Sequence, residues 1–220
     1  MKKLRTIIRW VIWTIAGLYI TIIVLLHIPA VQTFLAQQVS DAAGNKLGTE
    51  VRVGRIDLGF INRFVLDDIL IYDQSHKKML SASRVGARVD LLHLLRTGEI
   101  NISSAQVFGL QAELYKKSKD SKPNYQFVLD SLASKDTTSH TPLHLSINSL
   151  VIRHGHIKYD CLDSPSTPNQ LNLNHINLSD ISSYLILHKL NDTSVWVDLR
   201  TLSFKEPAGL EVKQWAFDLK

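Results

Sequence analysis

Apolar and polar residues alternate over most of the chain after Gly48. At residues 85–89, for example, Val85, Ala87 and Val89 alternate with Gly86 and Arg88. Successive side chains of a β-strand point to opposite faces, so this period predicts strands with one apolar face and one face in water. We expect about eleven such strands between residues 50 and 220. The period slips by one residue at 55–56 and 173–176, which predicts a bulge or bend.

A sheet of this size must bury its apolar face. It can pack into an ordinary sandwich, or it can curl into a groove whose aliphatic lining holds acyl chains. The alternation is compatible with both arrangements. The candidate groove-lining residues are Val85, Ala87, Val89, Leu143, Leu145, Ile147, Ile157, Tyr159, Val195 and Val197.

An uncharged segment at residues 10–28 precedes the predicted strands. At the helical rise it is about 28 Å long, close to the thickness of the bilayer hydrocarbon. Trp10 and Trp13 begin it, where indoles favour the membrane interface, and Ile28 ends it. A cleaved signal peptide is the alternative, but its apolar core is normally shorter and ends in a small-x-small site, which HIPAVQTF lacks. We therefore expect an uncleaved membrane anchor.

The charge distribution predicts the orientation of this anchor. The first 40 residues contain four cations and no acid, and the next charge of either sign is Asp41. The positive-inside rule places the N-terminus in the cytoplasm. The other 180 residues carry 21 basic and 20 acidic residues, so the net charge of +5 is no evidence for nucleic-acid binding.

Four segments follow from these patterns: a basic flank (1–9), the transmembrane anchor (10–28), an amphipathic helix (29–47) and a β domain (48–220). Pro29 suits the first turn of the helix. Its apolar residues recur at spacings of three and four. They are Val31, Phe34, Leu35, Val39, Ala42, Ala43 and Leu47. Two short helices are predicted within the β domain, at 90–96 and 125–133.

No recognised catalytic, cofactor-binding or metal-binding motif occurs in the chain, and we predict a protein that is not an enzyme and has no cofactor. His154 and His156 could share a strand face, but no third ligand is evident, so we interpret them as solvent-facing. Asp67 and Asp68 are interpreted as turn or edge residues. Cys161, the sole cysteine, cannot form an intrachain disulfide, and we expect a buried or half-buried thiol rather than a nucleophile.

A weak internal repeat has a period of about 45 residues. Ile102-x-Ser104-x-x-Val107 is echoed by the same pattern beginning at Ile147, and a glycine follows each copy. The two copies slip by one residue at Gly109 and Gly155.

The order of these features resembles the N-terminal part of the AsmA/TamB superfamily, the translocation and assembly module (TamB) branch in particular. The resemblance covers nearly the whole chain. It lies in the basic anchor, the following helix and a series of β segments. These segments are VRVGRIDLGFINRFVLDDILIYDQ, MLSASRVGARVDLLHLLRTGEI, INISSAQVFGLQAELYK, NYQFVLDSL and LHLSINSLVIRHGHIKYD.

This resemblance implies a mainly β fold, with an N-terminal transmembrane helix and an elongated, curved antiparallel β-groove with a few short helices. It implies a bacterial inner-membrane protein with its bulk in the periplasm. Phospholipid acyl chains are the implied ligand, and an Omp85-family outer-membrane barrel is a possible partner. The implied function is phospholipid transport between membranes, outer-membrane protein assembly, or both. No catalytic residues are carried over.

Members of the TamB branch are usually far longer and end in a β-rich domain. We therefore expect an N-terminal fragment, a truncated product or a short relative, with the β domain incomplete. Two other hypotheses remain at this point. One is a membrane-anchored adaptor that binds envelope proteins by strand addition. The other is an anchored enzyme, which would need a pocket containing His154, His156 and Asp160.

Overall fold

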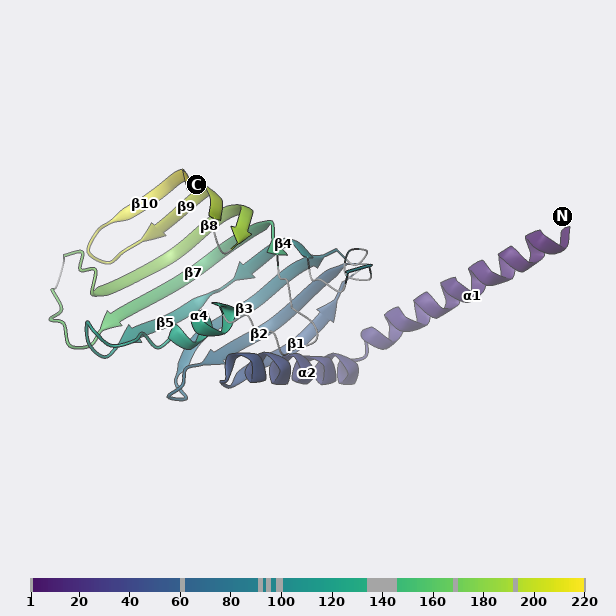
Figure 1. Ribbon diagram of the computed structural model, residues 1–220, viewed down its shortest axis with the longest axis horizontal. Helices are drawn as coiled ribbons and strands as arrows, with labels where there is room; N and C mark the ends of the chain where they lie inside the picture. Colours follow the sequence, from purple (N-terminus) through teal and green to yellow (C-terminus); the bar gives the residue numbers. More distant parts are fainter. Residues whose placement is uncertain are drawn as a thin grey trace.

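The computed structural model describes residues 2–59, 62–90, 93, 96–97, 101–133, 146–167, 170–191 and 194–219. Within them the chain is mainly β. Ten strands belong to one sheet, and two consecutive helices precede it (Figure 1). The predicted mainly β fold with an N-terminal apolar helix is confirmed. The predicted helix at 90–96 lies largely outside the described residues.

Helix α1 (Lys2–Leu26) projects away from the sheet (Figure 1). Its segment Arg5–Leu26 has a mean hydropathy of 2.0 and is long and apolar enough to cross a membrane or to serve as a signal sequence. Trp10 and Trp13 lie in this helix and are about 70% exposed. Ile28, the end of the predicted span, lies past α1 and is the N-cap of the next helix.

Helix α2 (Pro29–Leu47) packs along the first strand. Gly48 ends it in the left-handed conformation (φ 66°), and the Gly48 N–H donates to the Gly44 carbonyl. The Ser40 hydroxyl accepts a hydrogen bond from the Val53 N–H at 2.9 Å. Ala36 is buried, whereas Phe34 is 60% exposed. The face that packs on the sheet is therefore offset from the predicted apolar stripe.

Eight strands form the main path of the sheet, in the order β1-β2-β3-β4-β7-β8-β9-β10, while β5 pairs with β3 and β7, and β6 pairs with β4. Their bounds are β1 Val51–Leu58, β2 Arg63–Tyr72, β3 Lys78–Val89, β4 Asn101–Phe108, β5 Gln111–Lys116, β6 Ser146–Ile147, β7 Ser149–Cys161, β8 His175–Asn191, β9 Ser194–Lys205 and β10 Glu211–Leu219. A short helix, α4 (Gln126–Ala133), lies between β5 and β6 in sequence, close to the predicted range 125–133. It packs against α2.

The sheet is mixed, so the prediction of an antiparallel sheet is wrong at one seam. Strands β4 and β5 pair in parallel with β6 and β7, and the paired residues are always 45 apart in the sequence, as are Ile102 and Ile147. Parallel neighbours need a crossover of a dozen or more residues, and the segment containing α4 supplies it. The weak repeat in the sequence is therefore the register of this seam.

A line of unusual backbone crosses the sheet in the middle of its strands. Positive φ angles occur at Asp68 (54°), Gly109 (62°), His154 (54°) and Asp180 (51°). A Cβ built on Gly109 would lie 2.6 Å from the Ser83 Oγ. Gly109 also donates its N–H to the Arg153 carbonyl. We call this line, from β1 to β8, the crease.

The chain is far from compact. Its solvent-accessible surface is 15560 Å², whereas a compact monomer of this mass exposes about 10,000 Å². The excess reflects the exposed α1 and a sheet that forms a single layer. Few large apolar side chains are buried, and the largest fully buried side chains among the described residues are Asp73 and Cys161.

Candidate functional site

The strand register aligns apolar residues into rows that cross the whole sheet. Directly paired residues of neighbouring strands share a face. One row runs without a break in pairing through all eight strands of the main path. Its members are Ile56, Leu66, Val85, Val107, Ile152, Ser183, Leu202 and Trp215. Ser183 is its single polar residue.

A second row, entirely apolar, lies two residues further along each strand except β9, where a register shift makes the step three residues. Its members are Phe64, Ala87, Ala105, Leu150, Leu185, Leu199 and Phe217. On the other side of the crease a third row crosses six strands. Its members are Val51, Ile71, Leu80, Ala112, Ile157 and Leu178. The three rows together are called the apolar face.

The apolar residues change phase at the crease on each strand. On β1 the change is from Val53 to Ile56, and on β2 it is from Leu66 to Ile69, a spacing of three where a regular strand needs two. A bulge-type residue shifts strand alternation by one, and the positive φ of Asp68 marks such a residue on β2. We infer that the shift keeps the apolar side chains on one face through the bend. The phase slip predicted at residues 55–56 falls on this line.

Most of the apolar face is half-buried. Val85, Val107 and Ile152 are of intermediate exposure, and no second sheet lies against them among the described residues. At the β10 edge, Trp215 and Phe217 are 53% and 45% exposed, with ring centroids 5.6 Å apart. A half-buried apolar face with exposed aromatic rings at its edge is a candidate interaction site.

The predicted lining residues are distributed over this face. Val85 and Ala87 lie in the first two rows and Ile157 in the third, while Tyr159 pairs with Leu114 and Ile176. Val89 pairs with Ile102, which in turn pairs with Ile147.

The remaining predicted residues lie outside the three rows. Val195 and Val197 lie on β9, opposite Leu190 and Leu187. Leu143 and Leu145 lie outside the described residues.

The opposite face of the sheet carries a cluster of charged residues on its first three strands. Arg55, Asp67 and Arg84 are direct neighbours on β1, β2 and β3. The Asp67 carboxylate accepts hydrogen bonds from the Arg55 Nη2 at 2.8 Å and the Arg84 Nε at 2.7 Å. The hydrogen bond from Arg84 is the main cause of a pKa for Asp67 below its usual value. Asp67 therefore stays ionised as part of an ion-pair cluster.

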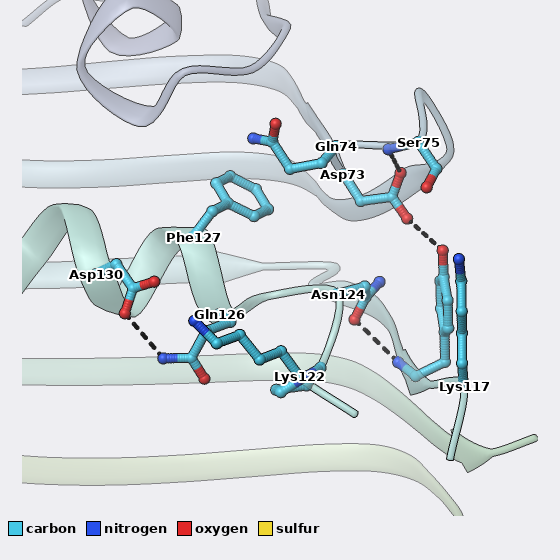
Figure 2. A pocket seen from close by; sticks show the side chains of 11 residues that line it. Asp73, Gln74, Ser75, Lys117, Lys122, Asn124, Gln126, Phe127 and Asp130 are labelled. Atoms are coloured by element: carbon cyan, nitrogen blue, oxygen red, sulfur yellow. Dashed lines mark hydrogen bonds between the residues drawn. The ribbon is translucent and has the colours of Figure 1, made fainter. Parts of the chain in front are cut away.

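A polar pocket of about 370 Å³ lies where the β2–β3 turn meets the segment between β5 and α4 (Figure 2). Beneath it the buried Asp73 carboxylate accepts hydrogen bonds from the Ser75 and Lys77 N–H groups and from the Tyr115 hydroxyl. Burial alone would raise the pKa of Asp73, but these hydrogen bonds outweigh it and the pKa lies below its usual value. Lys117, Lys122 and Phe127 also line the pocket.

The residues considered for catalysis do not form a catalytic set. His156 hydrogen-bonds Asn177 at 2.6 Å, whereas Asp160 contacts His175 and Lys158. His154 lies at the crease, where alternation is interrupted, so the expectation of a face shared with His156 does not apply. No cluster of three metal-ligating side chains occurs among the described residues.

Two other predictions concern individual side chains. Asp67 and Asp68 lie in the middle of an interior strand, so their interpretation as turn or edge residues is wrong. Asp68 occupies the left-handed position of the crease, which explains a second carboxylate beside Asp67.

Cys161 is fully buried, as expected, and its thiol donates to the Asp163 carboxylate at 3.1 Å.

Sequence reasoning missed the residues that connect the predicted positions into rows. They include Phe64, Leu66, Ala105, Val107, Leu150, Ile152, Leu185, Leu199 and Leu202. Part of the signal was present in the 45-residue repeat, which makes Val107 and Ile152 direct neighbours across the seam.

No protein-family model and no curated protein matches this chain.

Proposed function

We propose that this protein is a bacterial inner-membrane-anchored periplasmic protein of the AsmA/TamB type whose apolar face binds phospholipid acyl chains. The observation that carries the proposal is the row of apolar residues from Ile56 to Trp215, which continues across eight strands. The charged cluster on the opposite face and the apolar α1 support it. In this proposal α1 is the anchor, the N-terminus is cytoplasmic and the sheet is curved into a groove.

The proposed mechanism is passive. Seven spacings of about 4.8 Å separate β1 from β10, so the rows offer an apolar path of about 34 Å. Acyl chains lie along the rows while head groups remain in water. Burial contributes about 0.8 kcal/mol per methylene, which lowers the cost of moving a lipid through water but supplies no direction of flow. Transport would need a further partner, and an outer-membrane barrel of the Omp85 family is the proposed one.

Site-specific photo-crosslinking of the full chain in native membranes tests the proposal. A benzophenone residue at Val107 reports the apolar face, and one at the adjacent Gln106 reports the opposite face of the same strand. We expect phospholipid adducts at position 107, detected by mass spectrometry, and none at position 106. Position 157 with position 158 provides a second pair beyond the crease.

Equal lipid labelling at both members of each pair would indicate contact with bulk membrane, and the proposal would fail. A folded chain with no lipid at either position would also contradict it. Protein adducts at position 107 in place of lipid would point to a face covered by a protein partner.

Strand addition is a second candidate, because the two edges of the sheet differ. Helix α2 covers the β1 edge, and Ser40 accepts the Val53 N–H there. No described element pairs with the outer edge of β10, where Trp215 is 53% exposed. Unprotected edges accept further strands. A proline at position 214 or 216 should abolish partner capture while leaving lipid crosslinking at position 107 intact.

A further inference from the structure

We infer that the loops at one end of the sheet form a surface that docks on an anionic phospholipid bilayer. This surface, the loop rim, consists of the described residues of 73–78, 116–124, 162–174 and 206–210. Figure 1 shows these loops at the end of the sheet opposite the side from which α1 projects. The inference concerns a contact separate from the apolar face, so it does not depend on acyl-chain binding.

The loops of the rim are joined by direct contacts. The Leu162 N–H donates to the Lys116 carbonyl at 3.0 Å, and the Lys119 N–H donates to the Asp163 carboxylate at 3.3 Å. The Lys77 ammonium lies 5.6 Å from the centre of the Tyr115 ring. Residues 166–175 and the turn at 206–208 share another pocket. The rim is therefore one continuous surface.

One half of the rim is basic. Segments 73–78 and 116–124 carry six lysines and two aspartates, a net charge of +4. The lysines are Lys77, Lys78, Lys116, Lys117, Lys119 and Lys122. None of them forms an ion pair within the described part of the chain, unlike Lys158 and Lys205 elsewhere on the sheet. The net charge of +4 already includes the buried Asp73 carboxylate, which accepts hydrogen bonds from two backbone N–H groups and the Tyr115 hydroxyl rather than from a lysine ammonium.

The other half of the rim exposes leucines. Leu162, Leu171 and Leu173 are 62%, 53% and 73% exposed, and Leu210 in the β9–β10 turn is 41% exposed. Outside α1, α2 and the Ile28 between them, these four make up half of the eight large apolar side chains that are exposed among the described residues. Exposed single leucines are ordinary on a protein surface, but four on the same loop rim as lysines that form no ion pair make an amphipathic surface.

The chemistry of the rim favours a bilayer over a nucleic acid. Lysines attract anionic head groups at a membrane surface, and leucines insert between the acyl chains beneath them. A nucleic acid would bind the lysines through its phosphates, but it offers no apolar layer into which Leu171 and Leu173 could insert. The leucines therefore discriminate between the two classes of partner.

Vesicle capture by the full chain in nanodiscs tests the inference. With α1 embedded in discs of phosphatidylcholine, the rim is free to bind added vesicles. We expect co-flotation with vesicles that contain phosphatidylglycerol and not with vesicles of phosphatidylcholine alone. K117Q/K122Q should weaken capture about twenty-fivefold, at about fivefold per lysine. The matched control R63Q/R88Q removes two charges from exposed residues at the opposite end of β2 and β3 and should have no effect.

Each outcome decides the inference. Capture that requires phosphatidylglycerol and falls in both K117Q/K122Q and L171S/L173S supports it. Equal loss in K117Q/K122Q and R63Q/R88Q would overturn it, because the effect would then be one of net charge. Capture that is unchanged in L171S/L173S and competed away by double-stranded DNA would indicate a general polyanion site. Lipid crosslinking at position 107 should persist in K117Q/K122Q, so failure of the rim is distinguishable from failure of the apolar face.

Discussion

Replacement of Gly109 by alanine tests the account of the crease. Gly109 has a φ of 62°, a conformation that costs an L-residue about 1–2 kcal/mol. The added Cβ would also lie 2.6 Å from the Ser83 Oγ and 3.2 Å from the Ser83 Cβ. The hydroxyl can rotate away but the Cβ cannot, and overpacking of this kind costs about 1–3 kcal/mol. We expect G109A to lower the free energy of unfolding by about 2–4 kcal/mol.

The assay is urea unfolding of the full chain in detergent, followed by circular dichroism of the sheet. With a slope of about 2 kcal/mol/M, the midpoint should fall by about 1–2 M. Gly86 is the matched control, because it lies on β3 without a positive φ and its built Cβ meets no atom within 4 Å. G86A should leave the midpoint unchanged or raise it slightly. S83A keeps the Ser83 Cβ and should therefore recover little of the G109A defect.

Equal midpoints for G109A and G86A would refute the reasoning. The left-handed position would then carry no strain, and the crease would not be a constraint on the sheet. A large defect in G86A would also contradict it, because that position has room for a methyl group.

Three further predictions concern the ends of the strands. Y115F removes the hydroxyl that donates to Asp73 at 2.8 Å, and should destabilise the chain by about 1–3 kcal/mol in the same urea assay. His175 faces two acceptors, the Asp160 carboxylate and the Ser164 carbonyl, and the hydrogen bond to Asp160 is the main cause of a pKa above its usual 6.5. Protonated His175 stabilises the folded state, so the urea midpoint should fall as pH rises from 6.5 through the raised pKa, and H175Q should remove this dependence. Cys161 is fully buried, so a maleimide should label it only at the rate at which the chain unfolds. Labelling of the folded chain at the rate of a free thiol would show that Cys161 is not buried at the end of β7.

The sequence predicted the elements better than their assembly. Alternation at Val85–Val89 and the spacing after Pro29 identified a strand and a helix, because both depend on local side-chain periodicity. The parallel seam could not be deduced, because residue patterns on one strand do not state the direction of its neighbour. In the sequence repeat the two copies slip by one residue between Gly109 and Gly155, but the paired residues of the seam keep a constant offset of 45. His154, not Gly155, has the positive φ that matches Gly109 and lies 45 residues after it.

The candidate site was predicted in part for the same reason. Alternation assigns Ile157 and Val85 to the apolar side of their own strands. It does not show that they belong to different rows, because the crease separates those rows. The polar pocket could not be predicted, because Asp73 and Tyr115 are 42 residues apart and meet only in the folded sheet. The loop lysines were visible in the sequence, but the contact between Lys116 and Leu162 depends on how the strands end.

The parallel seam has a consequence for the order of folding. Strands β1 to β4 and strands β7 to β10 are each joined by antiparallel pairing, and the turns at 73–77 and 206–210 are short. The seam instead joins residues 45 apart. Closing that loop costs about 2 kcal/mol more chain entropy than closing a five-residue turn. The two antiparallel halves should therefore form first and the seam last. The apolar rows become continuous only at that final step, so a chain arrested before it would present two narrow amphipathic sheets with unpaired edges at β4 and β7, the form most exposed to aggregation.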